Sequence, residues 1–212
     1  GGDDCQWLFG TGDETNPAGI RGRDEPLGGI GNGRECRMRK QEVVIMAEPG
    51  KKELVVNLDK KGREEEVLAL IIADQPGDYY LKILVDHKVG NTFGRVMVRG
   101  VAKNGARVQV EGMIKIDKEA NGVDDFLEMR LLLLDDKSQA VAEPKLEIEA
   151  NEVKASHAAT VGKIDEEQLF YLASRGITGK EAERLIVDGF LNQVVDKIED
   201  RKIASKVGRI RL

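Results

Sequence analysis

His157 is the residue of this sequence best suited to take part in chemistry. Residues 152–156, which precede it, have the pattern of a short strand, and we expect this strand to end at the histidine. A neutral imidazole can bind iron or another transition metal. One histidine does not make a site, and a hydrogen-bonded or interface role is more common for this residue type. The second histidine, His87, stands beside Asp86 near an expected loop, where we predict a surface position.

The common catalytic motifs are missing. The sequence contains no C-x-x-C, H-E-x-x-H, P-loop or G-x-S-x-G pattern. Carboxylates are plentiful, but none forms a recognisable acid/base pair. Glu147 and Glu149 alternate with Leu146 and Ile148, which is typical of outward-facing residues on a strand. We therefore predict no catalytic residues.

The composition favours stacked strands and argues against two classes of partner. Hydrophobic residues make up 41% of the chain but aromatic residues only 4%, so the core must consist of aliphatic side chains. The net charge of -5 argues against nucleic-acid binding, which usually requires a basic excess. No apolar run approaches the roughly 20 residues that span a bilayer. Only Cys5 and Cys36 could form a disulfide, so we expect a cytoplasmic protein.

Three regions differ in pattern. Residues 1–45 contain 10 of the 24 glycines and no sustained periodicity, so we expect an irregular leader there. We also consider the hypothesis that this leader is not native and that Met46 is the natural start. Residues 46–162 contain short strand-like runs, and residues 163–212 have helical periodicity.

An internal repeat refines the expected fold of the middle region. Residues 95–102 and 107–114 share an arginine, two valines and a glycine at matching positions. We interpret each copy as a strand with a glycine where the chain bends. Short strands at even spacing are typical of a sandwich or a β-solenoid, and the repeat favours a parallel β-helix. A meander of hairpins is the alternative that these residues leave open.

The C-terminal region predicts a helical hairpin. Asp165 is a good N-cap, and Gly176 is placed to end the first helix. Thr178 and Glu181 form a capping-box pattern that opens a longer helix. This helix has an apolar stripe at helical spacing, formed by Ala182, Leu185, Ile186, Phe190, Val194, Val195 and Ile198. We expect the stripe either to pack on the last coil or to dock a partner.

Two consecutive segments resemble a known family. Residues 144–162 read PKLEIEANEVKASHAATVG, and residues 163–177 read KIDEEQLFYLASRGI. They are similar to the SufB/SufD family, and more to SufD, whose pattern includes a leucine-rich element that residues 131–137 match. The resemblance is specific over about residues 130–200 and weaker over residues 51–129.

The resemblance implies a mainly β fold, with a right-handed parallel β-helix followed by a small C-terminal helical domain. It also implies a non-catalytic scaffold for iron–sulfur cluster assembly. Such a subunit pairs through the end of its β-helix with a SufB-like subunit or a second copy, and its C-terminal helices dock a SufC-type ABC ATPase. The expected docking residues are Phe170, Leu185, Ile186 and Phe190.

Within the matching motif, His157 corresponds to a family histidine near the pairing interface that is implicated in cluster assembly. The family's usual cysteine two places earlier is Ala155 here, and the usual glycine after the histidine is Ala158. Thiolate ligands would therefore come from a SufB-like partner. We expect no cofactor bound tightly by this chain alone, only a transient iron–sulfur cluster at a shared interface.

Other functions remain open at this stage. A homo-oligomeric β-helix adaptor that has lost cluster chemistry would fit Ala155 and Ala158. A β-helix enzyme acting on polysaccharide fits less well, because the sequence lacks a paired acid/base signature and has few aromatic residues. The chain is also shorter than typical family members, as expected of a minimal homologue or a fragment.

Overall fold

The computed structural model describes residues 38–207, which form nine strands and three helices. The strands are β1 (Met38–Met46), β2 (Gly50–Leu58), β3 (Arg63–Ala73), β4 (Gly77–His87), β5 (Phe93–Ala102), β6 (Ala106–Ile116), β7 (Asp124–Leu133), β8 (Gln139–Ile148) and β9 (Lys154–Lys163). The helices are α1 (Glu166–Ser174), α2 (Gly179–Val195) and α3 (Arg201–Val207). Among the described residues, none of the helices is long and apolar enough to cross a membrane. Cys5 and Cys36 lie outside the described range.

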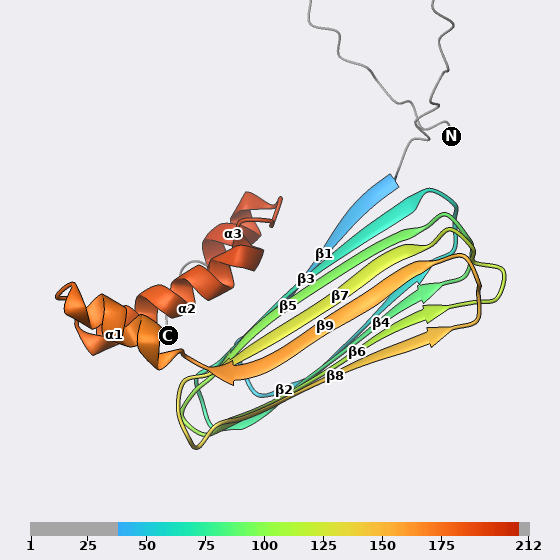
Figure 1. Ribbon diagram of the computed structural model, residues 1–212. Helices are drawn as coiled ribbons and strands as arrows, with labels where there is room; N and C mark the ends of the chain where they lie inside the picture. The colour runs from blue at the N-terminus through green and yellow to red at the C-terminus, as the bar shows by residue number, and fades with distance from the viewer. Residues whose placement is uncertain (1–37, 208–212) are drawn as a thin grey trace, which may run out of the picture. The chain divides into compact units, whose positions relative to one another are not determined.

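The strands form a parallel β-solenoid. Odd-numbered strands make a sheet in the order β1-β3-β5-β7-β9, and even-numbered strands make a second sheet in the order β2-β4-β6-β8. The chain alternates between these two layers, and every strand pairing is parallel (Figure 1). The predicted parallel β-helix with a C-terminal helical region is therefore confirmed. The hairpin meander is wrong, because hairpins pair antiparallel strands.

The internal repeat does not relate neighbouring coils. Its copies, residues 95–102 and 107–114, lie in β5 and β6, which belong to different sheets. Stacked partners instead come from strands of the same sheet, one full coil apart, as with Val67 beside Val96. The repeat thus marks two successive sides of one coil.

The repeated glycines make room for leucines and do not mark bends. Gly100 and Gly112 lie within β5 and β6, where a Cβ atom would come within 2.5 Å of Leu131 and 2.7 Å of Leu127. Contacts this short are not tolerated between carbon atoms, so a larger residue at either position would have to displace the leucine side chain that fills the space.

Aliphatic side chains fill the space between the two sheets. Every second residue of a strand points inward, as Val67, Ala69 and Ile71 do in β3, where they are completely buried. In-register pairing places each inward side chain on its equivalent in the next coil. A middle coil is therefore covered on both sides, whereas a terminal coil is covered on one side only.

The predicted leader extends too far. Residues 38–45, which lack a clear period, belong to β1, and this strand pairs residue by residue with β3. Met46 is the last residue of β1 and is buried. A chain that began at Met46 would lack most of this strand, and the hypothesis of a natural start at Met46 stays a prediction. The remainder of the leader, residues 1–37, lies outside the described residues.

The predicted helix ends are confirmed. Asp165 is the N-cap of α1 and accepts a hydrogen bond of 2.9 Å from its first turn. Gly176 follows the helix with a φ of 84°, a conformation that favours glycine. Thr178 and Glu181 form the capping box of α2. Hydrogen bonds from Thr178 lower the pKa of the Glu181 carboxyl.

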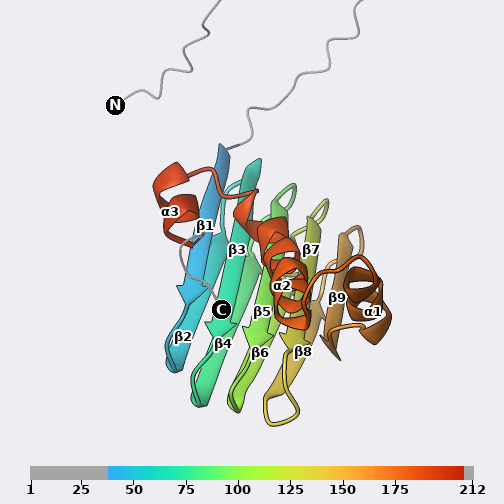
Figure 2. The same ribbon diagram turned by 90° about the vertical axis from the view of Figure 1, so that its left-hand side faces the viewer.

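The apolar stripe of the longer helix has an arrangement that we did not predict. α2 lies across the outer face of the five-stranded sheet, and not on the last coil (Figure 2). The buried side chains of this second apolar layer are Leu68, Leu70, Ile72, Val101, Val187, Leu191, Val194, Ile198 and Val207. The outer face of the sheet thus buries much of the apolar stripe of α2, and those residues are not open to a partner.

A buried ion pair holds α2 on the sheet. The Arg99 guanidinium of β5 contacts the Glu128 carboxylate of β7 at 2.8 Å, and both side chains are nearly inaccessible. Arg99 also donates two hydrogen bonds, of 3.0 and 3.1 Å, to the Gln193 amide oxygen of α2. Its guanidinium lies over the Phe190 ring, 5.7 Å from the centroid. One side chain therefore joins two strands and a helix.

We expect Arg99→Met to lower the free energy of unfolding by about 3 kcal/mol, because the Glu128 carboxylate would keep only the half-exposed Arg130 as its partner and Gln193 would lose both of its donors. Arg95, which pairs with Asp124 at an exposed site of the same strand, provides the matched control. Arg95→Met should cost far less. Urea denaturation measures both losses, and equal losses would contradict the role of Arg99.

Candidate functional site

The last coil of the described solenoid has an uncovered inner side. We call this surface the end face and define it by the inward-facing residues Leu146, Ile148, Ala155, His157, Ala159 and Val161 of β8 and β9. Leu146, Ile148 and Val161 are 36%, 40% and 40% exposed, although they rest on buried residues of the preceding coil. The expected alternation with Glu147 and Glu149 is present, but here the apolar side is also open to solvent.

The backbone at the end face can pair with another strand. β8 and β9 are the last strands of their sheets, and no described strand pairs with their outer edges. Such an edge offers a row of amide and carbonyl groups for strand addition. The end face therefore combines apolar side chains with free backbone groups, which is the chemistry of a protein–protein interface.

His157 lies in the middle of β9 and points into the end face, where it is exposed. The prediction that it ends a strand is wrong, because β9 continues to Lys163 and pairs with β7 along its length. His157 rests on Leu127, and the equivalent position of the first described coil carries Glu42. Among the described coils, polar residues thus occupy this position only in the two terminal ones, which have no described neighbour on one side.

The end face supplies one candidate metal ligand. Within residues 38–207, no group of three or more His, Cys, Asp or Glu side chains could hold a metal ion. Ala155, where the family has cysteine, is the next inward residue to His157 along β9 and rests on Asp125. These residues alone do not form a site for an iron–sulfur cluster, because they offer a single imidazole and no thiolate.

His87 is not on the surface, and its predicted position is wrong. Its side chain is completely buried between Thr92 and Asp125. Neither partner stands out in the sequence. A usable signal was the evenly spaced recurrence of asparagine at positions 91, 121 and 151. The first two of these meet at one corner of stacked coils, where the Asn91 N–H donates to the Asn121 carbonyl at 2.9 Å.

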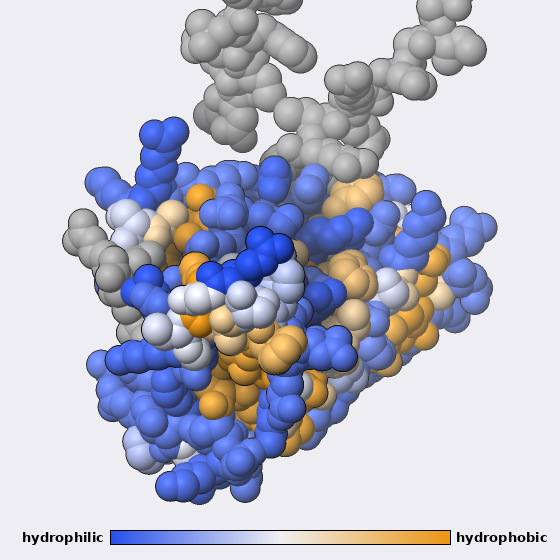
Figure 3. Space-filling view, turned by 60° about the vertical axis from the view of Figure 1, so that its left-hand side comes forward, coloured by the Kyte–Doolittle hydropathy of each residue, from blue (hydrophilic) through white to orange (hydrophobic). Residues whose placement is uncertain are grey.

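The four residues predicted to dock a partner have different environments. Phe170 of α1 is 76% exposed and Leu185 of α2 is 48% exposed. Ile186 is half-buried, and Phe190 is half-buried against Arg99 and the second apolar layer. Seen from the helical side, hydrophobic side chains gather within a largely hydrophilic surface (Figure 3). Of the predicted set, Phe170 and Leu185 are thus the most available to a partner.

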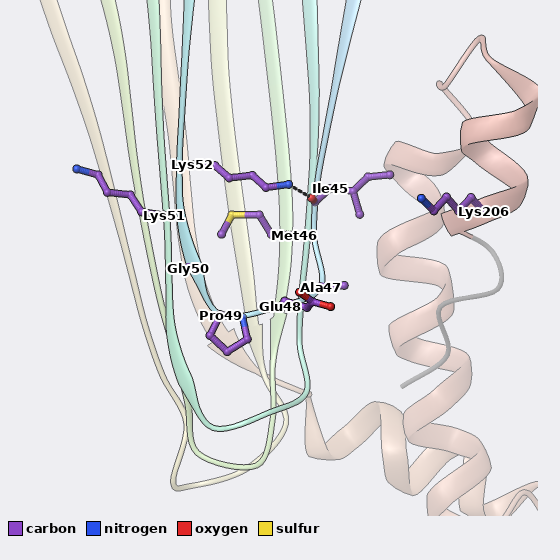
Figure 4. A pocket seen from close by; sticks show the side chains of 9 residues that line it. All are labelled: Ile45, Met46, Ala47, Glu48, Pro49, Gly50, Lys51, Lys52 and Lys206. Atoms are coloured by element: carbon purple, nitrogen blue, oxygen red, sulfur yellow. Dashed lines mark hydrogen bonds between the residues drawn. The ribbon is translucent and has the colours of Figure 1, made fainter.

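A hollow at the opposite end of the solenoid contains none of the predicted residues. It is lined by the β1–β2 turn, the first residues of β2 and Lys206 of α3. The Lys52 ammonium reaches across it and donates a hydrogen bond to the Ile45 carbonyl (Figure 4). Lys51 pairs with Glu53 instead. The hollow has no converging set of free polar groups among the residues that the structure describes.

Comparison with known proteins assigns the fold and the motif to one family. The family model described as SUF system FeS cluster assembly, SufBD core domain, matches residues 30–190. This match includes β1 and all residues of the end face. The chain therefore belongs to the SufB/SufD family of iron–sulfur cluster assembly proteins, as the motif around His157 indicated.

Individual relatives agree with this assignment. An iron–sulfur cluster assembly SufBD family protein of Mycobacterium leprae is 34% identical over 174 residues, which cover 78% of this chain and 44% of the relative. The iron–sulfur cluster assembly protein SufD of Bacillus subtilis is 42% identical over 105 residues, or 50% of this chain and 24% of the relative. The chain thus spans less than half the length of these relatives.

The two histidines should differ strongly in their effect on stability. We expect His157→Ala to change the free energy of unfolding by less than about 0.5 kcal/mol, because its side chain is exposed. His87→Ala should lower it by about 2 kcal/mol, because Thr92 and Asp125 would lose a buried partner. Chemical denaturation of both variants tests this, and similar losses would contradict the placement of the two residues.

Proposed function

We propose that this chain is a non-catalytic, SufD-like scaffold subunit that acts in the cytoplasm in iron–sulfur cluster assembly. The observation that carries the proposal is the end face, where inward-facing aliphatic residues of a parallel solenoid are open to solvent beside two free strand edges. Such a surface is stabilised when another molecule covers it. Membership of the SufB/SufD family supports cluster assembly as the process.

The partner at the end face is a SufB-like subunit or, failing that, a second copy of this chain. A partner with thiolates would complete the ligand set that this end face lacks, since it contributes His157 but has alanine at position 155. The cluster is then cargo held briefly at a shared interface. In this role His157 supplies one imidazole, and the aliphatic residues around it exclude water.

The C-terminal helices dock a SufC-type ABC ATPase in this proposal. Phe170 is a large aromatic residue that is exposed on α1, and Leu185 is an exposed aliphatic residue on α2. Exposed aromatic anchors of this kind contribute a large share of the binding energy in many interfaces. The buried layer beneath α2 fixes the helix on the sheet, so that a force applied to α2 reaches the solenoid through Arg99.

A homo-oligomeric adaptor without cluster chemistry is the second candidate. Ala155 favours it, because this position on the end face lacks the thiol that the family pattern has. Both functions use the same end face, and they differ in whether His157 matters once the complex has formed.

Pairing through the end face can be tested with a SufB-like partner. We expect Val161→Arg to weaken the complex at least tenfold, because a charge would be buried in the interface. Val141→Arg is the matched control, because Val141 is similarly exposed but faces outward on β8. His157→Ala should leave binding intact and reduce the cluster yield after anaerobic reconstitution with iron and sulfide.

The outcomes separate the alternatives. Equal loss of binding in both arginine variants would contradict the end face as the interface. A cluster yield that is unaffected by His157→Ala would contradict the scaffold with cluster chemistry and favour the adaptor.

Docking of the ATPase is tested separately. We expect Phe170→Ser to weaken capture of a purified SufC-type ATPase about tenfold, which corresponds to about 1.4 kcal/mol. Phe126→Ser removes an exposed phenylalanine from β7 and serves as the control. Quantitative pull-down measures both, and a Phe170 variant that binds like the unmodified chain would exclude α1 from the docking surface.

A further inference from the structure

Three polar side chains meet in a completely buried corner of the solenoid. His87 is the last residue of β4, Thr92 precedes β5, and Asp125 lies near the start of β7. The His87 Nδ1 atom is 2.7 Å from Thr92 Oγ1, and its Nε2 atom is 2.9 Å from Asp125 Oδ2. The side chains of His87 and Asp125 have no exposed surface. Neither the cluster chemistry nor partner docking requires these groups.

The contacts of Thr92 favour one arrangement of the hydrogens. Its hydroxyl lies 3.1 Å from the Val89 carbonyl, and when it donates there Oγ1 acts toward His87 as an acceptor. In this arrangement His87 Nδ1 carries a hydrogen. The short contact between Nε2 and Asp125 Oδ2 needs a second hydrogen, carried by either the imidazole or the carboxyl group. In both cases the pair has no net charge.

A neutral pair also fits the surroundings of Asp125. Its second oxygen, Oδ1, is buried and has no hydrogen-bond partner within the described residues. An ionised carboxylate with an empty acceptor and no cation would be costly in such a place. Glu65 of β3 lies at the same register position, beyond Gly94; its Oε1 accepts from Arg63 at 2.7 Å, and its Oε2 is also buried without a partner within the described residues.

The corner is built to hold Asp125 in one position. A Cβ atom at Gly94 would lie 2.2 Å from Asp125 Oδ2, so the carboxyl group occupies the space of a missing side chain on β5. One strand further, Ala155 rests on Asp125 and His157 rests on Leu127. The residues directly beneath the exposed histidine thus belong to a strand that is fixed at its start by His87.

We propose that His87, Thr92 and Asp125 form a lock of two buried hydrogen bonds that positions the start of β7, and through it the His157 segment of β9. His87 and Asp125 are positioning residues, because they do not reach the end face themselves. That the position of His157 matters for cluster assembly rests on the proposed function. The hydrogen bonds of the lock do not depend on that function.

Nitrogen NMR of the isolated full chain tests the lock directly. The sequence has only two histidines, so labelling histidine with 15N gives one buried and one exposed imidazole. We expect His87 to show a protonated Nδ1 and a ring hydrogen that exchanges slowly with solvent. A His87 ring with an unprotonated Nδ1, or with both ring hydrogens exchanging as fast as those of His157, would overturn the assignment.

Paired variants test the positioning role. Asp125→Asn keeps a donor for Nε2 and should leave the His157 signals and the amide exchange of β9 unchanged. Asp125→Leu removes it and should shift the His157 signals and speed exchange in β9 at least tenfold. Thr92→Ser keeps the hydroxyl and should behave like the unmodified chain. Thr92→Val removes it and should change the same signals as Asp125→Leu, to a smaller extent. This second pair remains informative if Asp125→Leu does not fold.

Equal effects within both pairs would overturn the positioning role. No partner protein is needed for these measurements, so a failure of the proposed function, seen as unchanged pairing of the Val161→Arg variant, is a separate outcome.

Discussion

The in-register stacking of parallel coils is the constraint on which the rest of this structure depends. Each inward side chain rests on its equivalent in the next coil, so the core is a set of columns that run from coil to coil. A column is satisfied only where it has a neighbour on both sides. The apolar side chains at the end of the described solenoid therefore stay exposed to solvent whatever the arrangement inside it, and the open apolar surface of the end face follows from the fold itself.

Much of this fold could be predicted, because it depends on local patterns. Alternation indicated strands, and the capping residues Asp165, Thr178 and Gly176 fixed the ends of the helices. The strand β3 lacks this alternation for a physical reason. It is buried under the solenoid core on one side and under α2 on the other, so residues 67–73 are apolar throughout and show no alternation. Alternate residues of β3 thus face two different apolar environments, the inner core and the layer under α2.

The candidate site was only partly predictable. The motif around His157 was recognisable because its residues are contiguous. The polar corner at His87 was not, because Asp125 is distant in the sequence and the two residues meet only through the coil spacing. The internal repeat gave the wrong spacing, since it relates two sides of one coil. Residues in contact between coils are separated by the length of a whole coil. The asparagines at positions 91, 121 and 151 recur at this spacing, whereas the aliphatic residues of the strands show no such period.

The double burial of β3 also affects how the chain folds. The inner core forms by contacts between residues of successive coils, whereas α2 reaches β3 only after every later strand of the solenoid has been added. Until then, Leu68, Leu70 and Ile72 form an apolar row on the outside of a partly built solenoid. During synthesis this exposed row makes the chain prone to aggregation, and it is buried only when α2 packs on it at the end of folding.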